Sequence, residues 1–203
     1  GLRAVDYRIT DAYADPPGEP DRLSFERLVR LTGSYFCYRP APETPEVGAL
    51  PCLASGHVTF GCFNNFAKLS GNFFDAAAQV LAAIPGSRLL LKSRPLSNPV
   101  VADPVRRRFE LAGVDPGRIE MRGWESERKD HLAIYGAVDI ALDSFPYNGA
   151  TTTCEALWMG VPVVSLVGDR HAGRVGASLL NAMELGEFVA RDTTRKPTAE
   201  PSS

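Results

Sequence analysis

The sequence predicts an α/β protein in which helices cover both faces of a parallel β-sheet. From His57 onward, short apolar runs alternate with longer stretches in which apolar residues recur at helical spacing. Some runs are continuously apolar, such as Arg88–Lys92 with its three leucines, which is typical of strands buried on both faces. Strands that alternate with helices predict parallel pairing. The chain has 203 residues, 44% hydrophobic and 23% charged, which suits one sizeable globular domain and part of a second.

The first residues of the chain predict a smaller unit with strands of its own. Val5–Asp11 alternates loosely between apolar and polar side chains, and Ser34–Tyr38 is aromatic, so both segments favour strands. Between them, Ala14–Asp21 is rich in Pro, Gly and Asp and predicts an exposed loop. Arg22–Leu31 carries apolar residues among charges and predicts a short helix or turn.

Prolines recur through residues 39–46, which predicts a linker without regular structure. We therefore divide the chain at this point into residues 1–45 and a main domain over residues 46–192. The remaining residues, 193–203, are polar and contain proline, so we expect a disordered tail.

Helix boundaries in the main domain follow from capping and breaking residues. Asp103-Pro104 fits an N-cap followed by the first helical residue, and Ser126 fits the N-cap of a later helix. Pro85-Gly86 ends one helix and Gly113 another. The predicted strands are 58–63, 88–92, 118–121, 138–142, 161–166 and 188–190. The predicted helices are 73–84, 103–113, 126–135, 152–159 and 173–183.

In an open parallel sheet, ligands bind outside the carboxyl ends of the strands. This rule predicts one crevice built from the segments that follow the strands. Those segments are 64–68, 93–94, 123–126, 143–153 and 168–174.

The segment Asp143–Glu155 is the strongest candidate for a binding site. A buried strand leads through Pro146, Asn148 and Gly149 into three consecutive threonines that begin a helix. The first N–H groups of a helix lack partners and carry partial positive charge, so this turn predicts an anion site. Glu155 lies about one turn further along the helix, where its carboxylate can accept a hydrogen bond from a sugar hydroxyl. The structural alternative is that Thr151 or Thr152 serves only as an N-cap.

Other polar residues of the predicted crevice have weaker signals. The side chains of Asn64 and Asn65 can hydrogen-bond to a base or a sugar, and Lys68 offers a positive charge to a phosphate. The ordinary alternative for a lone lysine is a solvated side chain. His131 and Arg128 lie in a helix, where surface exposure is the ordinary alternative. The Gly-flanked, basic segment 168–174 fits either a second anion contact or an exposed loop.

Composition and motifs exclude several classes of protein. A net charge of −2 gives no reason to expect nucleic acid or an anionic membrane as a partner. No apolar run is long enough to span a bilayer, and no secretory leader begins the chain. No G-x-G-x-x-G follows the first strand of the main domain, and no Ser/His/Asp arrangement is evident.

The cysteines and acidic residues predict neither a disulfide framework nor a metal site. Cys37, Cys52, Cys62 and Cys154 form no C-x-x-C pair, which fits a reduced, cytoplasmic protein. Cys154, close to the threonines, is better explained as a small buried residue than as a nucleophile. Without clustered metal ligands, the site must take positive potential from the backbone and Lys68. A transferase with a nucleotide diphosphate leaving group needs such potential.

Four segments resemble the bacterial branch of the O-linked N-acetylglucosamine transferases, which belong to glycosyltransferase family 41 together with SPINDLY-like proteins. These segments are Asp6–Asp11, Val58–Lys68, Asp139–Val164 and His171–Ser178, and the resemblance extends to about Asp192. It implies a GT-B fold of two Rossmann-like halves, with the donor held mainly by the C-terminal half. It also implies metal-independent, inverting transfer of N-acetylglucosamine from UDP-GlcNAc to Ser or Thr of a protein acceptor, with no cofactor.

The resemblance also implies roles for individual residues. Lys68 matches an essential phosphate-contacting lysine, the residue to which we assign a catalytic role. The nucleotide-sugar site that the family pattern implies is Asn65, Lys68, His131, Asn148, Gly149, Ala150, Thr151, Thr152 and Glu155. Ala150 departs from the family, since a histidine or threonine is usual there, and one nucleotide contact is lost.

We expect this chain to be a piece of a longer protein, because it opens on Gly1 and the TPR repeats of the family are absent from it. It would comprise the end of the N-terminal GT-B half and most of the C-terminal half, a donor-binding fragment with little or no activity alone. Two alternatives stay open. The donor could be GDP-fucose, as in SPINDLY-like members, or the chain could be a non-catalytic nucleotide-sugar-binding module.

Overall fold

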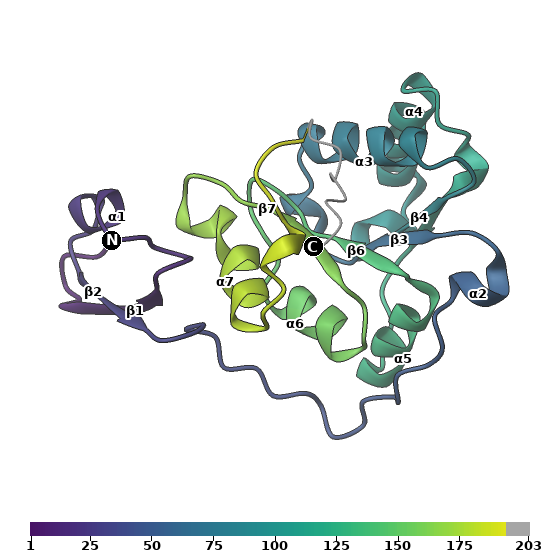
Figure 1. The fold of residues 1–203 in the computed structure, drawn as a ribbon. Helices are drawn as coiled ribbons and strands as arrows, with labels where there is room; N and C mark the ends of the chain where they lie inside the picture. The colour runs from purple at the N-terminus through teal and green to yellow at the C-terminus, as the bar shows by residue number, and fades with distance from the viewer. Residues whose placement is uncertain (194–203) are drawn as a thin grey trace, which may run out of the picture.

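The computed structural model describes residues 1–193 and contains two parallel β-sheets (Figure 1). The smaller sheet pairs β1 (Tyr7–Asp11) with β2 (Arg27–Leu31). The larger sheet has six strands: β3 (Thr59–Cys62), β4 (Arg88–Lys92), β5 (Ile119–Arg122), β6 (Ile140–Leu142), β7 (Val163–Leu166) and β8 (Val189–Ala190). The predicted tail begins at Thr193 and otherwise lies outside the described residues.

The larger sheet has the order β5-β4-β3-β6-β7-β8, with every neighbouring pair parallel. Its first strand, β3, therefore lies between the second and the fourth, which is the order of a doubly wound nucleotide-binding fold. The chain winds outward in one direction from β3 and in the other from β6. The carboxyl ends of β3 and β6 consequently flank a topological switch point, where such folds bind ligands.

Helices cover both faces of the larger sheet, as the alternation of strands and helices predicted. On one face lie α3 (Gly71–Ala83) and α4 (Pro99–Leu111). On the other lie α5 (Arg128–Ala133), α6 (Thr151–Trp158) and α7 (Val175–Ala182). Figure 1 shows α3 and α4 opposite α5 and α6 across the strands. The predicted α/β class is confirmed.

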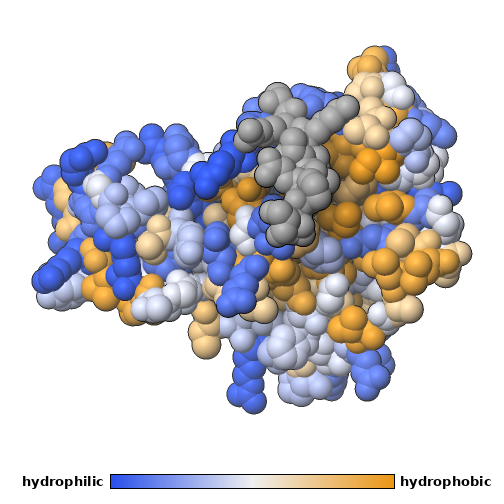
Figure 2. Space-filling view, viewed as in Figure 1, coloured by the Kyte–Doolittle hydropathy of each residue, from blue (hydrophilic) through white to orange (hydrophobic). Residues whose placement is uncertain are grey.

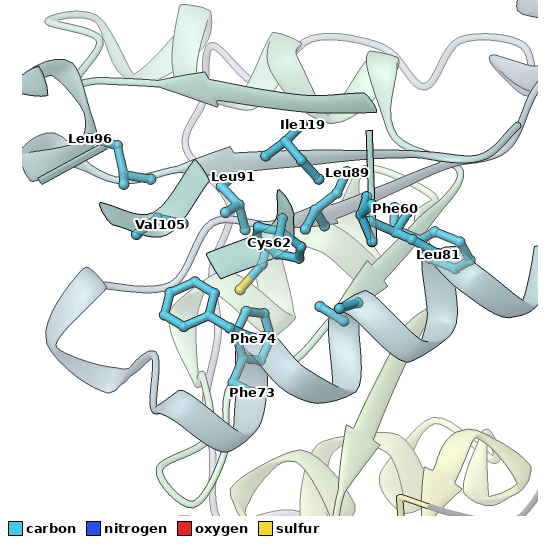
Figure 3. Packing of buried hydrophobic residues seen from close by; sticks show 14 residues of the cluster. Phe60, Cys62, Phe73, Phe74, Leu81, Leu89, Leu91, Leu96, Val105 and Ile119 are labelled. Carbon is cyan, nitrogen blue, oxygen red and sulfur yellow. The ribbon is translucent and has the colours of Figure 1, made fainter. Parts of the chain in front are cut away.

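The leucines of β4 explain why its sequence shows no alternation. Leu89 and Leu91 pack into the cluster beneath α3 and α4, whereas Leu90 packs into the cluster beneath α5, α6 and α7 (Figure 3). All three are at most 1% exposed. Burying such a side chain contributes about 1.5–3 kcal/mol, so this strand anchors both halves of the core.

Two helix starts differ from those predicted. Helix α4 begins at Pro99, where the side chain of Asn98 caps the helix by accepting from the Val100 N–H. Asn98-Pro99 and Asp103-Pro104 carry the same start signal, and the earlier pair begins the helix, so Pro104 lies inside it. Helix α5 begins at Arg128, with Glu127 at the N-cap position instead of Ser126.

The N-terminal unit differs most from the sequence prediction. The predicted helix or turn over Arg22–Leu31 is wrong, because this stretch holds the end of a short helix, α1 (Glu19–Leu23), followed by β2. The predicted loop over Ala14–Asp21 includes the start of α1 and two buried residues, Ala14 and Asp15. Ser34–Tyr38 forms no strand.

The remaining elements are short. Helix α2 covers Cys52–Ser55 in the connection between the two sheets. Single 3₁₀ turns are η1 (Phe66–Lys68), η2 (Arg94–Ser97), η3 (Pro116–Arg118), η4 (Ile134–Ala137), η5 (His171–Gly173) and η6 (Gly186–Phe188). Within residues 1–193, no helix has the length and hydropathy needed to cross a membrane.

Candidate functional site

The loop between β6 and α6, residues 143–150, lies at the switch point beside the end of β3. Its first residue, Asp143, is 5% exposed and accepts hydrogen bonds from the Gly149 N–H at 2.7 Å, from Ser165 Oγ at 2.7 Å and from Asn64 Nδ2 at 3.1 Å. Burial raises the pKa of Asp143 to about 6, although these hydrogen bonds favour the charged form. Asp143 thus ties β3, β7 and the loop together.

Gly149 is required by close packing. A Cβ atom there would lie 2.5 Å from Thr152 Oγ1 and 2.6 Å from Asn64 Oδ1. Thr152 Oγ1 itself donates to Asn64 Oδ1 at 2.5 Å. The loop therefore folds tightly against the end of β3, and any larger residue would push the start of α6 away from it.

The buried side chain of Asn148 stabilises the loop through hydrogen bonds. Its side chain is 1% exposed, donates to the Ser144 carbonyl at 2.9 Å and accepts from the Gly176 N–H at 3.2 Å. Its own N–H donates to the Ala172 carbonyl at 2.8 Å. Asn148 therefore holds the loop to η5 and α7, and its backbone carbonyl stays free for a partner from the other side.

Lys68 reaches that carbonyl from the other side of the switch point. Its Nζ donates to Asn148 O at 2.9 Å and lies 4.2 Å from the centre of the Tyr147 ring. Burial lowers the pKa of Lys68, while the nearby Asp143 carboxylate opposes that shift. The structure places the ammonium group next to the loop that leads into the threonines, as the sequence predicted.

The first turn of α6 has no side-chain cap. The N-cap residue is Ala150, so the interpretation of Thr151 or Thr152 as an N-cap is wrong. Thr151 is exposed, Thr152 bonds to Asn64, and Thr153 is buried. An apolar N-cap leaves the first-turn N–H groups without a capping oxygen, and the helix dipole adds positive potential.

A second polar cluster lies along the next turn of α6. Glu155 is 4% exposed and accepts from Arg128 Nη2 at 3.0 Å and from His131 Nε2 at 3.1 Å. The other ring nitrogen, His131 Nδ1, is 2.8 Å from Lys92 Nζ. The structure thus brings two predicted site residues, Glu155 and His131, together. It adds Lys92, which the sequence analysis did not consider, and Arg128, which that analysis left out of the site.

Lys92 and Arg128 carried signals that could have revealed them. Lys92 ends a strand whose other residues include three buried leucines, and a charge at that position must have a partner. The chain has only four lysines against 18 arginines. Two of the four lie at the carboxyl ends of neighbouring strands: Lys92 ends β4, and Lys68 lies in the turn after β3. Arg128 precedes His131 by three residues, so both project from one side of α5.

The other predicted residues, Asn65 and the segment 168–174, mainly contact other parts of the protein. Asn65 is exposed and caps η1 by accepting from the Ala67 N–H at 3.0 Å, whereas Asn64 is buried among protein partners. Arg174 donates to the carbonyls of Tyr13 and Gly168. His171 contacts Asp15 and Tyr35. The segment 168–174 therefore joins the N-terminal unit, and its basic side chains already have protein partners.

Hydrogen bonds join four of the five post-strand segments. Ser93 Oγ accepts from the Phe66 N–H at 2.9 Å, which joins the second segment to the first. Lys68 and Asn148 join the first to the fourth, and Asn148 and Ala172 join the fourth to the fifth. The third segment lies beside η2, where Gly123 packs against Ser97.

The cysteines are free thiols. Burial raises the pKa of the Cys154 thiol to about 11, which opposes a nucleophilic thiolate at neutral pH. Within residues 1–193, no group of three His, Cys, Asp or Glu side chains is arranged to hold a metal ion.

Comparisons with known proteins agree on one family. The sequence profile of glycosyl transferase family 41 matches residues 49–198. A protein of Solanum lycopersicum named probable UDP-N-acetylglucosamine–peptide N-acetylglucosaminyltransferase SPINDLY is 45% identical over 196 residues, 95% of this chain and 20% of its own length. The protein SEC of Arabidopsis thaliana, with the same enzyme name, is 28% identical over 199 residues, 92% of this chain and 19% of its length.

A solved structure gives the same result. A lysine-to-methionine mutant of the O-GlcNAc transferase of Thermobaculum terrenum superposes with a TM-score of 0.88 at 41% identity, over 95% of this chain and 36% of that protein. This chain accordingly spans about a fifth of the length of the SPINDLY relative and about a third of the bacterial structure.

Proposed function

This chain belongs to glycosyltransferase family 41, and from that membership we propose that it binds the nucleotide-sugar donor of a protein O-GlcNAc transferase. The donor is UDP-GlcNAc, and the acceptor is a Ser or Thr hydroxyl of a protein. The names of the SPINDLY, SEC and Thermobaculum relatives, which all refer to transfer of N-acetylglucosamine, support this assignment.

One observation carries the proposal: Lys68 Nζ lies 2.9 Å from the Asn148 carbonyl, two residues before the uncapped start of α6. The ammonium group thus contacts the loop that leads directly into the α6 N-terminus, whose first residue, Thr151, is exposed. Two phosphates placed there would meet donors from both sides. Such a site stabilises a diphosphate with groups that are already oriented before the ligand arrives.

The same donors suit the chemistry of transfer. The acceptor oxygen forms a bond to C1 of the sugar as the bond from C1 to the β-phosphate oxygen breaks. The electron pair of that bond leaves with UDP, and the proton of the acceptor hydroxyl is released to solvent. Negative charge therefore grows on the β-phosphate in the transition state. Lys68 and the first turn of α6 stabilise that growing charge more than the ground state, which lowers the barrier.

The second cluster suits the nucleoside. Each Glu155 oxygen accepts one hydrogen bond from the protein, and a carboxylate oxygen has capacity for another. We assign Glu155 to a ribose hydroxyl, and His131 and Asn65 to the same nucleoside. Because Ala150 has no polar side chain, the nucleotide receives no side-chain hydrogen bond from that position.

The cellular setting follows from weaker observations. All four cysteines are free thiols, which favours a reducing compartment, and we propose the cytoplasm.

Calorimetric titration of the chain with UDP tests the site. We expect saturable binding, and Lys68→Ala should weaken it by about 10–100-fold, the effect of losing a charge-assisted hydrogen bond. Lys129→Ala is the matched control, since Lys129 is an exposed lysine on α5 and should leave the affinity unchanged. Absence of UDP binding, or equal affinity in the Lys68 variant, would contradict the proposal.

The same titration with GDP separates the two donor classes. Tighter binding of UDP supports UDP-GlcNAc, whereas a preference for GDP would replace it with a GDP-sugar such as GDP-fucose. This alternative is worth an explicit test because the chain is 45% identical to a SPINDLY protein but 28% identical to SEC.

A further inference from the structure

Lys92 is a buried lysine at the carboxyl end of β4, and neither the family comparison nor the sequence motifs give it a role. It is 5% exposed and follows three leucines that are at most 1% exposed. Burial lowers the pKa of Lys92, while the carboxylates of Glu125 and Glu155 oppose that shift. An ammonium group in this place is costly to keep, so the contact that it makes is informative.

The contact of Lys92 is with one nitrogen of His131. Lys92 Nζ lies 2.8 Å from His131 Nδ1, and the Trp124 ring is 5.9 Å from the same ammonium. An ammonium group has only donors, so Nδ1 must accept and cannot itself carry a proton. The ring proton then sits on Nε2, which is 3.1 Å from Glu155 Oε2.

Packing holds the ring in this orientation. The centre of the His131 ring lies 6.1 Å from that of Phe63 and 5.9 Å from that of Tyr135. One hydrogen-bonded chain therefore runs from Lys92 through His131 to Glu155, and Arg128 bonds the other oxygen of the same carboxylate. A charge that polarises one member of such a chain strengthens the next bond.

We propose that Lys92 is a positioning residue, which holds His131 in the Nε2–H tautomer and through it fixes the Glu155 carboxylate. The first step, control of the His131 tautomer by Lys92, stands on the geometry of this cluster alone. The second step is an effect of the fixed Glu155 carboxylate on ligand affinity. This second step rests on the proposed function, because it requires that Glu155 receives the nucleoside. Lys92 touches no ligand in this scheme and acts entirely through His131.

Long-range ¹H–¹⁵N NMR of the histidine rings tests the first step. At neutral pH the wild-type His131 ring should show a protonated Nε2 and an unprotonated Nδ1, with its signals assigned by their loss in His131→Phe. Lys92→Met removes the donor but keeps the length of the side chain, and should abolish this single-tautomer pattern. Lys129→Met removes a charge from α5 without touching the ring, and should leave the pattern intact.

Two results would overturn the first step. One is a wild-type His131 ring with its proton on Nδ1, which needs no variant and so does not depend on folding. The other is an unchanged pattern in Lys92→Met that circular dichroism shows to be folded. Lys92→Gln, which keeps one neutral donor, replaces the methionine variant if the latter does not fold.

UDP titration tests the second step. We expect Lys92→Met to weaken UDP binding by about tenfold, the lower range for residues that orient ligand-binding groups. Lys92→Arg, which keeps charge and donors, should bind more tightly than the methionine variant. Equal affinity in Lys92→Met and Lys129→Met would overturn this step. If the wild type itself fails to bind UDP, the proposed function fails, while the NMR result still decides the role of Lys92.

Discussion

Both sheets of this protein are parallel, but they are stabilised in opposite ways. The six-stranded sheet packs apolar clusters against both of its faces, and the leucines of its strand β4 are at most 1% exposed. The two-stranded sheet leaves apolar side chains exposed, among them Tyr7 at 58%, Ile9 at 60% and Leu31 at 45%. Figure 2 shows this unit as a mainly hydrophilic surface with separate apolar patches.

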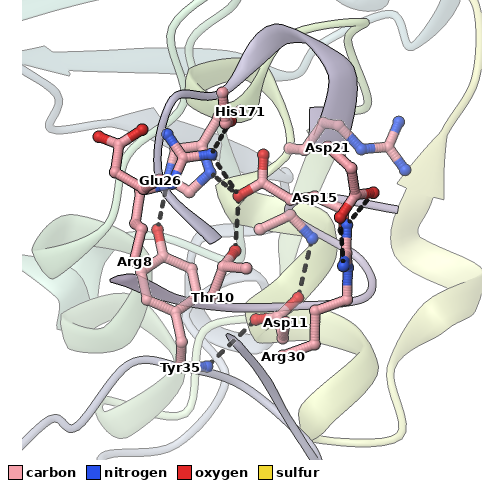
Figure 4. Close-up of polar contacts among 12 residues, drawn as sticks. Arg8, Thr10, Asp11, Asp15, Asp21, Glu26, Arg30, Tyr35 and His171 are labelled. Atoms are coloured by element: carbon pink, nitrogen blue, oxygen red, sulfur yellow. Dashed lines mark hydrogen bonds and ion pairs between the residues drawn. The ribbon is translucent and has the colours of Figure 1, made fainter. Parts of the chain in front are cut away.

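Polar contacts hold the smaller sheet against the larger domain (Figure 4). His171 of η5 bonds to Asp15 at 2.8 Å and to Tyr35 at 2.9 Å, and Ser178 of α7 donates to Asp11. Burial alone would raise the pKa of Asp15, but hydrogen bonds from Thr10 and His171 outweigh it and lower the pKa. Apolar packing on both faces thus stabilises the larger sheet, whereas polar contacts with the larger domain hold the smaller one.

The core of the larger sheet should show the largest effect. Leu89→Ala removes a fully buried side chain beneath α3 and α4. We expect a loss of about 2–5 kcal/mol in the free energy of unfolding, measured by urea denaturation. Leu111→Ala, at a position 80% exposed on α4, is the control and should change stability by less than about 0.5 kcal/mol.

Asp143 should make the stability of the larger domain depend on pH. Its pKa is raised from 3.8 to about 6, so between these values the folded chain keeps a proton that the unfolded chain releases. Its contribution to stability is therefore complete below pH 4 and is lost as the pH rises through 6. Relative to Asp143→Asn, the wild type should lose about 2–3 kcal/mol of stability between pH 4 and pH 7.

Urea denaturation of both proteins across that range measures this difference. A constant gap between wild type and Asp143→Asn would show that Asp143 is ionised throughout. The buried hydrogen-bond network under the threonine turn would then stabilise the carboxylate more than burial penalises it.

The polar anchor of the smaller sheet should give an intermediate and local effect. His171→Leu removes the bonds to Asp15 and Tyr35 and leaves a buried carboxylate with fewer donors. We expect about 1–3 kcal/mol of lost protection, visible as faster amide hydrogen exchange in β1 and β2 and unchanged exchange in β4. His57→Leu, outside this interface, should alter neither. Equal acceleration in both sheets would show that they unfold as one unit.

The exposed face of the smaller sheet should give the smallest effect. Ile9→Ser and Val29→Ser replace neighbouring side chains that are 60% and 39% exposed. Each should change the free energy of unfolding by less than about 0.5 kcal/mol, measured by the same denaturation assay. A loss of several kcal/mol would mean that this face is covered in solution.

The sequence determined the larger domain because its strands and helices have different periodicities. Continuous apolar runs marked strands buried on both faces, and the helix over 73–84 matched α3 to within two residues. The rule that ligands bind at the carboxyl ends of such strands predicts Lys68 beside the threonine turn, where the structure has it. Local signals failed where two of them competed, as at Asn98 and Asp103, or where a five-residue strand followed a short helix, as in β2.

Only the tertiary structure decided how residues from separate strands and helices combine into one site. Lys92, Arg128, His131 and Glu155 come from β4, α5 and α6, and no spacing along the chain shows that they meet. The same holds for the contact between His171 and Asp15, which are 156 residues apart. Periodicity reports whether a side chain faces the core, whereas its partner is set by strand order and helix placement, which follow from packing of the whole domain.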